Sequence, residues 1–309
     1  MSSLDPAVEP PNPDIATPVR MRLGVVLPNE SALADPREIV RLAVQAEELG
    51  YDHVWLPDHL LPPEPYGPVY GGAFEAIALL SHIAAVTRRV TLGTSVLILP
   101  LRDPVLLAKQ VATVERLAPG RVVLGIGVGW EKSEFTALGL DFTERGRRTD
   151  EAIGLVRSLH STGAGDFQGR FHRIDGGVFA PVPTAPVPVM VGGTSDAALR
   201  RAARIGDLWQ AFGLTPDQFR ARRATLRELA AGRPVRAGAV VSWKGDGLGG
   251  AGPEDPGPLV RAAGEWEAAG ADHLAVHFGA LPGAAVRMRE FVHAFRPGPA
   301  AGAAATPVG

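Results

Sequence analysis

The sequence predicts one α/β domain of the (β/α)8 TIM-barrel class, flanked by a tail at each end. Short β-type runs alternate with amphipathic helical runs throughout residues 20–296, which indicates a parallel sheet. The alternation gives eight strand–helix units, and this core is close to the roughly 250 residues typical of a closed barrel. A doubly wound open sheet is the competing architecture for the same pattern.

The two ends differ in composition from the core. The chain contains 37 glycines and 28 prolines among 309 residues, yet 46% of its residues are hydrophobic and only 21% are charged, which favours a packed core over disorder. Residues 1–19 are rich in proline, residues 297–309 form a Pro/Gly/Ala run, and neither stretch has apolar periodicity. We therefore expect a barrel domain at residues 20–296 between two disordered tails.

The composition also excludes several classes of protein. Cysteine is absent, which excludes disulfide scaffolds, cysteine nucleophiles and thiolate metal sites. The formal net charge of −2 and the lack of a basic block argue against nucleic-acid binding. The longest apolar stretch, residues 90–101, is too short to span a bilayer, and the first residues lack the order of a secretory signal. These features predict a cytoplasmic protein.

The first half of the core begins with a buried strand at residues 21–27, which is apolar throughout. Asp35-Pro36 then opens a helix, with aspartate as N-cap and proline at the first helical position, and Gly50 ends it. A strand at residues 52–56 leads into a long irregular loop, 57–72. The remaining elements of this half are helices at 74–86, 105–117 and 145–160 and strands at 90–94 and 121–127.

The second half repeats the pattern after a break. Residues 163–187 are expected to be irregular, with a short hairpin around residues 167–179. The elements that follow are strands at 187–191, 207–211, 235–243 and 272–278 and helices at 195–205, 216–230, 258–269 and 284–295.

In a barrel of this class, chemistry lies at the carboxyl ends of the strands. Glycines at three successive ends favour the close approach of a flat ligand, although they also suit a tapering barrel interior. The predicted ends are Asp58-His59 after the second strand, Gly93-Thr94-Ser95-Val96 after the third, residues 125–131 (GIGVGWE) after the fourth, Gly192-Gly193-Thr194-Ser195 after the fifth, Trp209-Gln210 at the sixth, Trp243-Lys244 at the seventh and His277-Phe278 at the eighth.

Two of these ends point to specific chemistry. The turn at residues 192–195 directly precedes a helix, and free N–H groups at a helix N-terminus suit a phosphate; the alternative is an ordinary N-cap at Thr194 or Ser195. His59 could hydrogen-bond a flavin-type ring or shuttle a proton, and His277 is a second candidate; the alternative is a histidine packed as a polar core residue.

Two other interpretations are set aside. The Gly125-x-Gly-x-Gly pattern resembles a dinucleotide fingerprint, but it lies inside a strand, and no acidic residue closes a second strand about 20 residues later. The histidines form no pair with metal-ligand spacing that carboxylates support, so we predict no metal site.

Taken together, these stretches resemble the luciferase-like monooxygenase superfamily, particularly its branch of coenzyme F420-dependent oxidoreductases. The resemblance is carried by residues 46–60 (AEELGYDHVWLPDHL), 90–130, 144–153 (ERGRRTDEAI) and 187–209, and it extends over essentially the whole core. It implies a TIM barrel that holds F420, or alternatively FMN, across its carboxyl-terminal mouth. It also implies a non-prolyl cis peptide at Ser95-Val96 that supports the central face of the ring.

The resemblance further implies which strand ends hold the cofactor. It implies Asp58 and His59 near the ring edge, Thr94, Ser95 and Val96 behind the ring, Gly127, Val128 and Gly129 along its polar end, and Gly192, Gly193, Thr194 and Ser195 around the phosphate.

One position departs from the sugar-phosphate dehydrogenases of this family. Their catalytic glutamate follows the glycine that corresponds to Gly129, where this chain has Trp130 and then Glu131. We therefore do not expect the sugar-phosphate reaction. The expected substrate-pocket residues are Trp130, Trp209 and Trp243, and the candidate proton donors are His59, His277 and Glu131.

The predicted function is F420H2-dependent reduction of an activated C=C, C=N or C=O group in a small molecule or natural product. The alternatives are an FMN-dependent monooxygenase supplied by a partner reductase and a ligand-binding barrel without catalysis. Expected partners are a small-molecule substrate, an F420 or flavin reductase and, as is frequent in the family, a second copy in a homodimer. The resemblance implies that loops 57–73, 131–145, 163–187 and 244–257 set substrate specificity.

Overall fold

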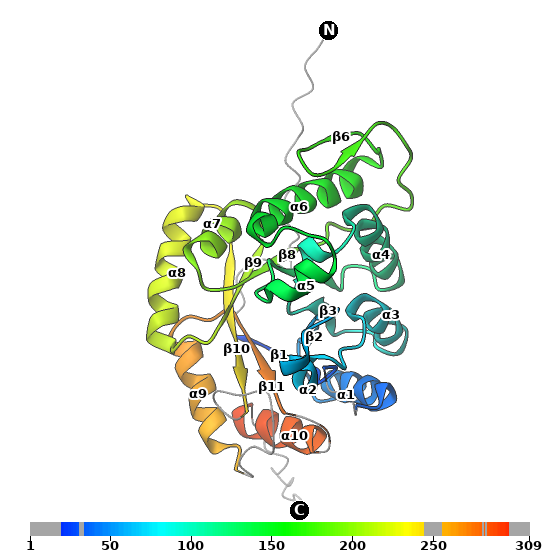
Figure 1. Ribbon diagram of the computed structural model, residues 1–309. Coiled ribbons are helices and arrows are strands. Elements are labelled where there is room, and N and C mark those ends of the chain that lie inside the picture. Colours follow the sequence, from blue (N-terminus) through cyan, green and yellow to red (C-terminus); the bar gives the residue numbers. More distant parts are fainter. Residues whose placement is uncertain (1–19, 31–33, 244–254, 280, 282, 297–309) are drawn as a thin grey trace, which may run out of the picture.

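The computed structural model describes residues 20–30, 34–243, 255–279, 281 and 283–296 (Figure 1). The two predicted tails, residues 1–19 and 297–309, and most of loop 244–257 lie outside the described residues. None of the described helices is both long enough and apolar enough to cross a membrane.

Eight parallel strands form a closed barrel. Hydrogen-bonded neighbours follow the order β3-β2-β1-β11-β10-β9-β8-β5, and the pairing of β3 with β5 closes the ring. This closure confirms the predicted (β/α)8 TIM barrel and excludes the open sheet. The barrel strands are β1 (Arg22–Val26), β2 (His53–Leu56), β3 (Thr91–Thr94), β5 (Val122–Gly127), β8 (Val189–Gly192), β9 (Leu208–Phe212), β10 (Arg236–Ser242) and β11 (His273–His277).

In the described part of the chain, one outer helix follows each of the eight barrel strands (Figure 1). Seven of these helices connect consecutive barrel strands, and α10 follows the last strand, β11. Several begin at the predicted caps: the Asp35 carboxylate accepts a hydrogen bond from the Arg37 amide, and the Asp103 carboxylate accepts one from the Leu106 amide. The helices are α1 (Pro36–Glu48), α3 (Ala76–Val86), α4 (Pro104–Leu117), α6 (Arg145–Thr162), α7 (Asp196–Ile205), α8 (Pro216–Ala230), α9 (Gly257–Ala268) and α10 (Ala284–Phe295).

The segments between these elements contain shorter pieces of regular structure. The antiparallel pair β6 (Phe167–Gln168) and β7 (Arg173–Ile174) confirms the predicted hairpin. The prediction that residues 57–72 and 131–145 are irregular was wrong, because both contain short helices. The additional elements are the helices η2 (Glu64–Tyr66), α2 (Gly67–Tyr70), η3 (Leu99–Leu101), α5 (Lys132–Ala137) and η4 (Phe142–Glu144) and the strand β4 (Leu97–Ile98).

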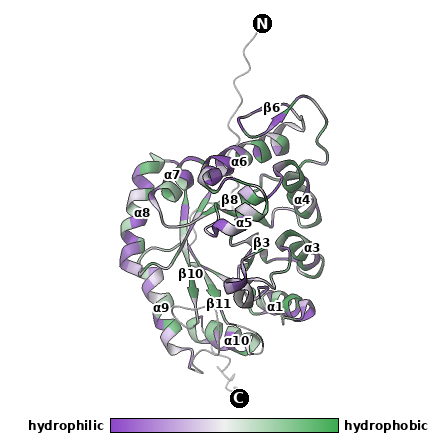
Figure 2. Ribbon diagram, in the orientation of Figure 1, coloured by the Kyte–Doolittle hydropathy of each residue, from purple (hydrophilic) through white to green (hydrophobic). Residues whose placement is uncertain are grey.

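Apolar side chains fill two layers. The larger cluster lies between strands and helices, and a smaller one, which includes Val26, Trp55 and Met190, fills the barrel interior. Figure 2 shows that hydrophobic and hydrophilic residues alternate along the ribbon of the outer helices α7 and α8. Each helix therefore buries one face against the barrel, and this packing leaves the strand ends open at the mouth.

Candidate active site

A cavity of about 350 Å³ lies at the carboxyl ends of the strands, and each of the eight barrel strands or the loop that follows it contributes a lining residue. The predicted site residues that line this cavity are Asp58, His59, Ser95, Val96, Gly127, Val128, Gly129, Trp130, Gly192, Gly193 and His277. The structure therefore brings most of the predicted residues together at the mouth of the barrel.

The floor of the cavity is built around a cis peptide. The Ser95-Val96 bond is cis, as the resemblance implied. The Val96 side chain fits between two glycines: a Cβ on Gly127 would lie 2.5 Å from Val96 Cγ2, and a Cβ on Gly192 would lie 2.6 Å from Val96 Cγ1. Larger residues at either glycine would displace Val96, so both glycines are needed for this floor. We call residues 95–96 the cis bulge.

Gln210, at the end of β9, presents an unused donor beside the cis bulge. The Ser95 hydroxyl donates a hydrogen bond to Gln210 Oε1 at 2.5 Å, which orients the amide. Its Nε2 is buried and has no hydrogen-bond partner among the described residues. Because a buried amide donor without a partner is costly, Gln210 Nε2 fits a ligand carbonyl or ring nitrogen in the cavity.

Asp58 lines the cavity, and both of its carboxylate oxygens are engaged in holding the backbone. Oδ2 accepts from the Ile98 amide at 2.9 Å, and Oδ1 accepts from Arg102 at 2.6 Å. The other guanidinium nitrogen of Arg102 donates to Glu75 at 2.7 Å. Asp58 therefore ties the loop after β2 to the segment that follows the cis bulge.

His59 is held by a buried carboxylate. Its Nδ1 lies 3.0 Å from Glu134 Oε2, and Glu134 Oε1 accepts from the amides of Leu60 and Leu61. Burial alone would raise the pKa of Glu134, but hydrogen bonds from His59 and from these amides lower it below its usual value. The ionised carboxylate therefore keeps a proton on Nδ1 and leaves Nε2 as the imidazole atom available for proton exchange.

His277 presents a neutral imidazole to the cavity. Burial lowers the pKa of His277 to about 4. The Gly279 amide donates to its Nδ1 at 3.1 Å, so the proton of the neutral ring resides on Nε2. His277 can therefore donate a hydrogen bond, but as a cation it would be costly at neutral pH.

Glu30, in the loop after β1, is a titratable lining residue that the sequence analysis did not select. It is 8% exposed and makes no hydrogen bond or ion pair within the described part of the chain. Burial raises the pKa of Glu30 to about 7, an effect that the charge of His59 partly opposes. A carboxyl that titrates near neutrality in a cleft is suited to acid–base chemistry or to binding a cation.

Three aromatic rings form one wall of the mouth, and we call Tyr66, Tyr70 and Trp130 the aromatic wall. Tyr70 stacks on His59 with ring centroids 4.6 Å apart. The Trp130 ring meets Tyr66 edge-on at 5.0 Å and Tyr70 at 6.1 Å. The wall therefore extends from His59 outward to the solvent, where Trp130 is 51% exposed.

The turn before α7 lies at the opposite side of the mouth. Gly193 has φ +113°, a conformation that favours glycine, and Ser195 caps the helix by accepting from the Ala198 amide. Arg222, from α8, donates to the Thr194 carbonyl and to Asp196, the latter at 2.7 Å. Arg222 is thus paired with Asp196, and the N-terminus of α7 gives this side of the mouth a partial positive charge.

Six of the predicted site residues do not line the cavity, and their contacts show what each does instead. Ser195 is the cap just described, and Thr194 is bound through its carbonyl. The Thr94 hydroxyl donates to the Gly125 carbonyl at 2.6 Å, and Trp209 Nε1 donates to the Gly193 carbonyl at 2.7 Å. The Trp243 backbone amide donates to the His277 carbonyl at 2.9 Å. The Glu131 carboxylate caps α5 by accepting from the Ser133 amide at 3.0 Å.

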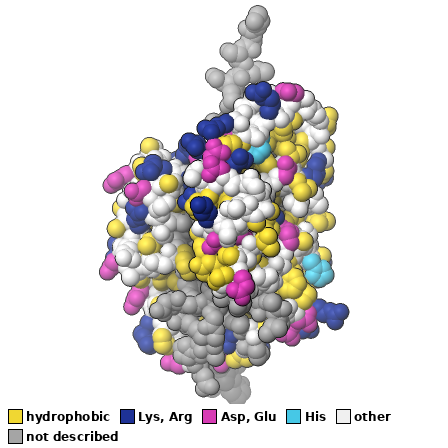
Figure 3. Space-filling model, viewed as in Figure 1, with side chains coloured by type: hydrophobic (Ala, Val, Ile, Leu, Met, Phe, Trp, Pro, Cys, Tyr) yellow, Lys and Arg dark blue, Asp and Glu magenta, His cyan; other side chains and the backbone are white. Residues whose placement is uncertain are grey.

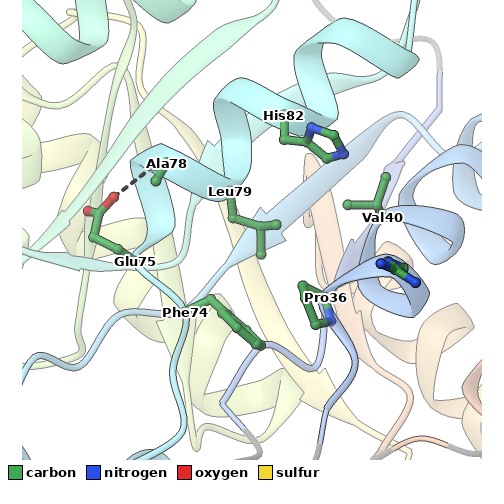
Figure 4. A pocket seen from close by; sticks show the side chains of 8 residues that line it. Pro36, Val40, Phe74, Glu75, Ala78, Leu79 and His82 are labelled. Atoms are coloured by element: carbon green, nitrogen blue, oxygen red, sulfur yellow. Dashed lines mark hydrogen bonds between the residues drawn. The ribbon is translucent and has the colours of Figure 1, made fainter.

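Other cavities of the described structure carry less chemistry. One of about 310 Å³ lies outside the barrel between α1 and the start of α3, where Figure 4 shows Pro36, Val40, Phe74 and Leu79 facing the space and His82 at its edge. Another of similar size is lined by Arg148 and His172, from the side of α6. Among the described residues, no group of three or more His, Asp or Glu side chains is placed to hold a metal ion.

The residues that sequence analysis missed fall into two groups. Glu30 follows the first strand by four positions, so applying the strand-end rule to that strand would have found it. Gln210 was noted at a strand end without a role. Glu134 and Tyr70 carried no comparable signal, because they lie on short helices inside segments that the sequence analysis treated as irregular.

The chain is similar in sequence to proteins of one known family. The family model for luciferase-like monooxygenases matches residues 21–244. The chain is 37% identical over 215 residues to an uncharacterized protein of Mycobacterium tuberculosis, a match that covers 64% of this chain and 74% of the relative. It is 40% identical over 176 residues to the F420-dependent glucose-6-phosphate dehydrogenase of Kineococcus radiotolerans, which covers 56% of this chain and only 51% of that relative.

A solved structure shares the fold over nearly its full length. The F420-dependent secondary alcohol dehydrogenase in complex with an F420-acetone adduct aligns with a TM-score of 0.75, covering 89% of this chain and 98% of that chain. The sequence identity is 18%, so this likeness shows a common fold.

Proposed function

The chain belongs to the luciferase-like monooxygenase family, and from that premise we propose that it is an F420-dependent oxidoreductase. The proposed reaction is transfer of hydride from reduced F420 to an activated C=C, C=N or C=O group of a small molecule. The named relatives and the similar structure that use F420 support the choice of cofactor. A separate enzyme would supply the reduced cofactor.

The observation that carries this proposal is the floor of the mouth cavity. Val96, packed between Gly127 and Gly192, lines the cavity and offers a surface for one face of a flat ring. Gln210 Nε2 offers a buried donor without a partner beside it, which suits the carbonyl or nitrogen edge of a deazaflavin or flavin. The residues present therefore fit a ring of this class.

The turn before α7 is the proposed phosphate site. The first amides of α7 would supply hydrogen bonds and the partial positive charge of the helix N-terminus. Arg222 holds this turn through the Thr194 carbonyl and Asp196, and Gly193 leaves the approach open. When bound, F420 would supply a hydride carrier that reacts poorly with oxygen. The chain's own task is to bury one face of the ring, to present substrate to the other face and to move a proton.

Two groups of this chain are proposed to handle that proton. His59 lines the cavity with its Nδ1 bonded to Glu134, and Glu30 lies near enough for their charges to interact. His277 would act as a neutral hydrogen-bond donor through Nε2. Glu131 caps α5 outside the cavity, so we no longer propose it as an acid; Trp130 remains the proposed wall of the substrate pocket.

Titration of the purified protein with F420 and with FMN, followed by fluorescence quenching, tests the cofactor. We expect F420 to bind more tightly than FMN. Tight FMN binding with none of F420 would instead favour a flavin-dependent monooxygenase, and binding of neither would contradict the proposal.

The phosphate site is tested by a matched pair of variants. Gly193→Asp and Gly193→Asn add side chains of the same shape to the same strained position, but only the aspartate repels a phosphate. We expect F420 affinity to fall at least about tenfold further in Gly193→Asp than in Gly193→Asn. Equal affinities in the two variants would place the phosphate elsewhere.

A further inference from the structure

The charge of the cavity lining is one-sided. No lysine or arginine is among the residues that line the mouth cavity in the described part of the chain, whereas the acids Glu30 and Asp58 are, and Arg102 pairs with the Asp58 carboxylate. Arg102 lies behind Asp58 and is 10% exposed, with its guanidinium engaged by Asp58 and Glu75. A phosphorylated or carboxylated substrate would therefore meet the Glu30 carboxyl with no lysine or arginine of the described lining facing it.

The cationic features of the mouth lie on the other side. Around the barrel, β1 and β8 are separated by β2, β3 and β5 in one direction and by β11, β10 and β9 in the other, so Glu30 and the α7 turn face each other across the opening. Arg222 and the α7 N-terminus belong to the β8 side. Figure 3 shows Lys and Arg side chains over α6 and α7, with Asp and Glu side chains among them.

The side that carries Glu30 combines a carboxyl with aromatic rings. Glu30 is buried and unpaired within the described residues, and its charge interacts with both His59 and Tyr70. Tyr70 and Trp130 line the same cavity, and Phe212, 61% exposed, lines it from the end of β9. Aromatic faces next to a buried carboxylate are the groups that bind organic cations, and flat walls favour flat ligands.

We propose that Glu30 and the aromatic wall bind the substrate as a planar organic cation, a protonated imine, and reject phosphorylated or anionic substrates. This inference rests on the proposed function for the source of hydride. It assigns Glu30 as the counter-ion of the substrate and Tyr70 and Trp130 as the faces that contact it. The raised pKa of Glu30 is consistent with this role, because a bound cation would favour the ionised carboxyl.

The reaction balances without a further co-reactant. The imine carbon accepts a hydride from reduced F420, a C–H bond forms, and the C=N π pair moves to nitrogen, which gives a neutral amine. The substrate gains two electrons and the carrier loses two. When bound, reduced F420 would give up one proton with the hydride. His59 would accept that proton beside the Glu30 carboxylate, which no longer faces a cation.

Binding of three probes with one ring skeleton to the cofactor-free protein tests the proposal. The probes are N-methylquinolinium, quinoline and quinoline-6-carboxylate, at about pH 8, with calorimetry as the readout. We expect the cation to bind at least about fivefold more tightly than neutral quinoline and the anion to bind most weakly. Equal binding of all three, or a preference for the anion, would overturn the proposal.

Single-residue variants test which residues cause the preference for the cationic probe. In Glu30→Gln the cation and the neutral probe should bind within about twofold of each other. The control Glu64→Gln changes an exposed acid on η2, the short helix that carries Tyr66, and should keep the preference. Trp130→Leu should weaken both flat probes. A cation preference that survives Glu30→Gln would overturn the assignment of Glu30.

Two further measurements separate this inference from the proposed function. Saturating F420 should leave the cation bound, because substrate and cofactor occupy different parts of the cavity; competitive displacement would contradict the substrate assignment. With F420H2, reduction of 3,4-dihydroisoquinoline should exceed that of cyclohexenone at least about tenfold in kcat/KM, and glucose 6-phosphate should not reduce F420. Failure of F420 to bind would overturn the proposed function while the probe series still decides the charge preference.

Discussion

Glu30 differs from the other buried carboxylates near the mouth because nothing in the described chain neutralises it. Asp58 is paired with Arg102 and a backbone amide, and Glu134 is paired with His59 and two amides. Glu30 is instead buried without a hydrogen bond or ion pair in the described part of the chain, and burial raises its pKa to about 7. The free-energy cost of burying the Glu30 carboxyl in the folded protein therefore depends on pH.

The pH dependence of stability tests this environment. Because the folded protein keeps the Glu30 proton to about pH 7 while the ordinary value is 4.5, the contribution of Glu30 is most favourable below pH 4.5 and is lost as pH rises toward 7. Gln cannot ionise, so Glu30→Gln should gain up to about 3 kcal/mol relative to wild type between those two pH values. Urea unfolding of both proteins across this pH range measures the difference in their free energies of unfolding. Parallel plots of that free energy against pH would contradict the raised pKa of Glu30.

Glu134 and His59 are expected to act as one unit. His59→Ala should lower turnover of a reducible substrate by about 100-fold or more, since a general acid–base group contributes that much. Glu134→Gln should lower it less, because the imidazole remains but loses its carboxylate partner. The double variant should be no slower than His59→Ala alone. Additive losses would mean that Glu134 acts independently of His59, and far-ultraviolet spectra check that each variant is folded.

At the scale of elements, the most consequential contact joins the loop after β2 to the strand β4. Asp58 connects these segments through the Ile98 amide and Arg102, and the Asp58 side chain is 1% exposed. This contact holds the cis bulge in place from behind. It also explains why Asp58 can be essential without touching a ligand.

Removal of the contact between Asp58 and Arg102 should destabilise the folded protein. Asp58→Ala leaves Arg102 buried beside an empty site and should lower the free energy of unfolding by about 3–5 kcal/mol. Arg41→Ala is the matched control, because its ion pair with Glu38 joins side chains that are 67% and 46% exposed, and it should cost less than about 1 kcal/mol. Denaturant unfolding compares them, and similar losses in both would show that Asp58 is not an anchor.

The short helices at the mouth mark the limit of sequence prediction at this scale. The helix α5 has only six residues and is stabilised by Phe135, which packs against Ile98 and Leu101 on the far side of the cis bulge. Isolated helices of this length are not stable, so local propensity alone gives no signal. The long outer helices carried their own caps and apolar faces and were predicted within a few residues.

For the whole molecule, barrel closure requires that some strands approach one another without side chains between them. A Cβ on Gly125 would lie 1.8 Å from the Thr94 carbonyl oxygen, which is backbone and cannot move aside. By contrast, Gly154 lies in α6 with nothing within 4 Å of the added atom. The two glycines therefore test closure and local helix stability separately.

Alanine at these two positions should have opposite effects. Gly125→Ala should destabilise the barrel by at least about 1–3 kcal/mol through overpacking. Gly154→Ala should stabilise the protein by about 0.5–1 kcal/mol, because alanine loses less backbone entropy in a helix. Thermal unfolding of both variants distinguishes the effects, and a tolerated Gly125→Ala would contradict the close approach of β3 and β5.

The sequence by itself determined the barrel, the order of its strands and helices, and the strand ends that line the mouth. It could do so because apolar periodicity, caps and strand-end glycines are local features of the chain. Only the tertiary structure decided what each polar side chain faces. Glu30 is unpaired, Glu134 lies behind His59, and Gln210 presents a free amide, because residues distant in sequence meet across the closed barrel. Burial and hydrogen-bond partners determine the chemistry of these side chains, and closure of the barrel determines how deeply each one is buried and which partners it meets.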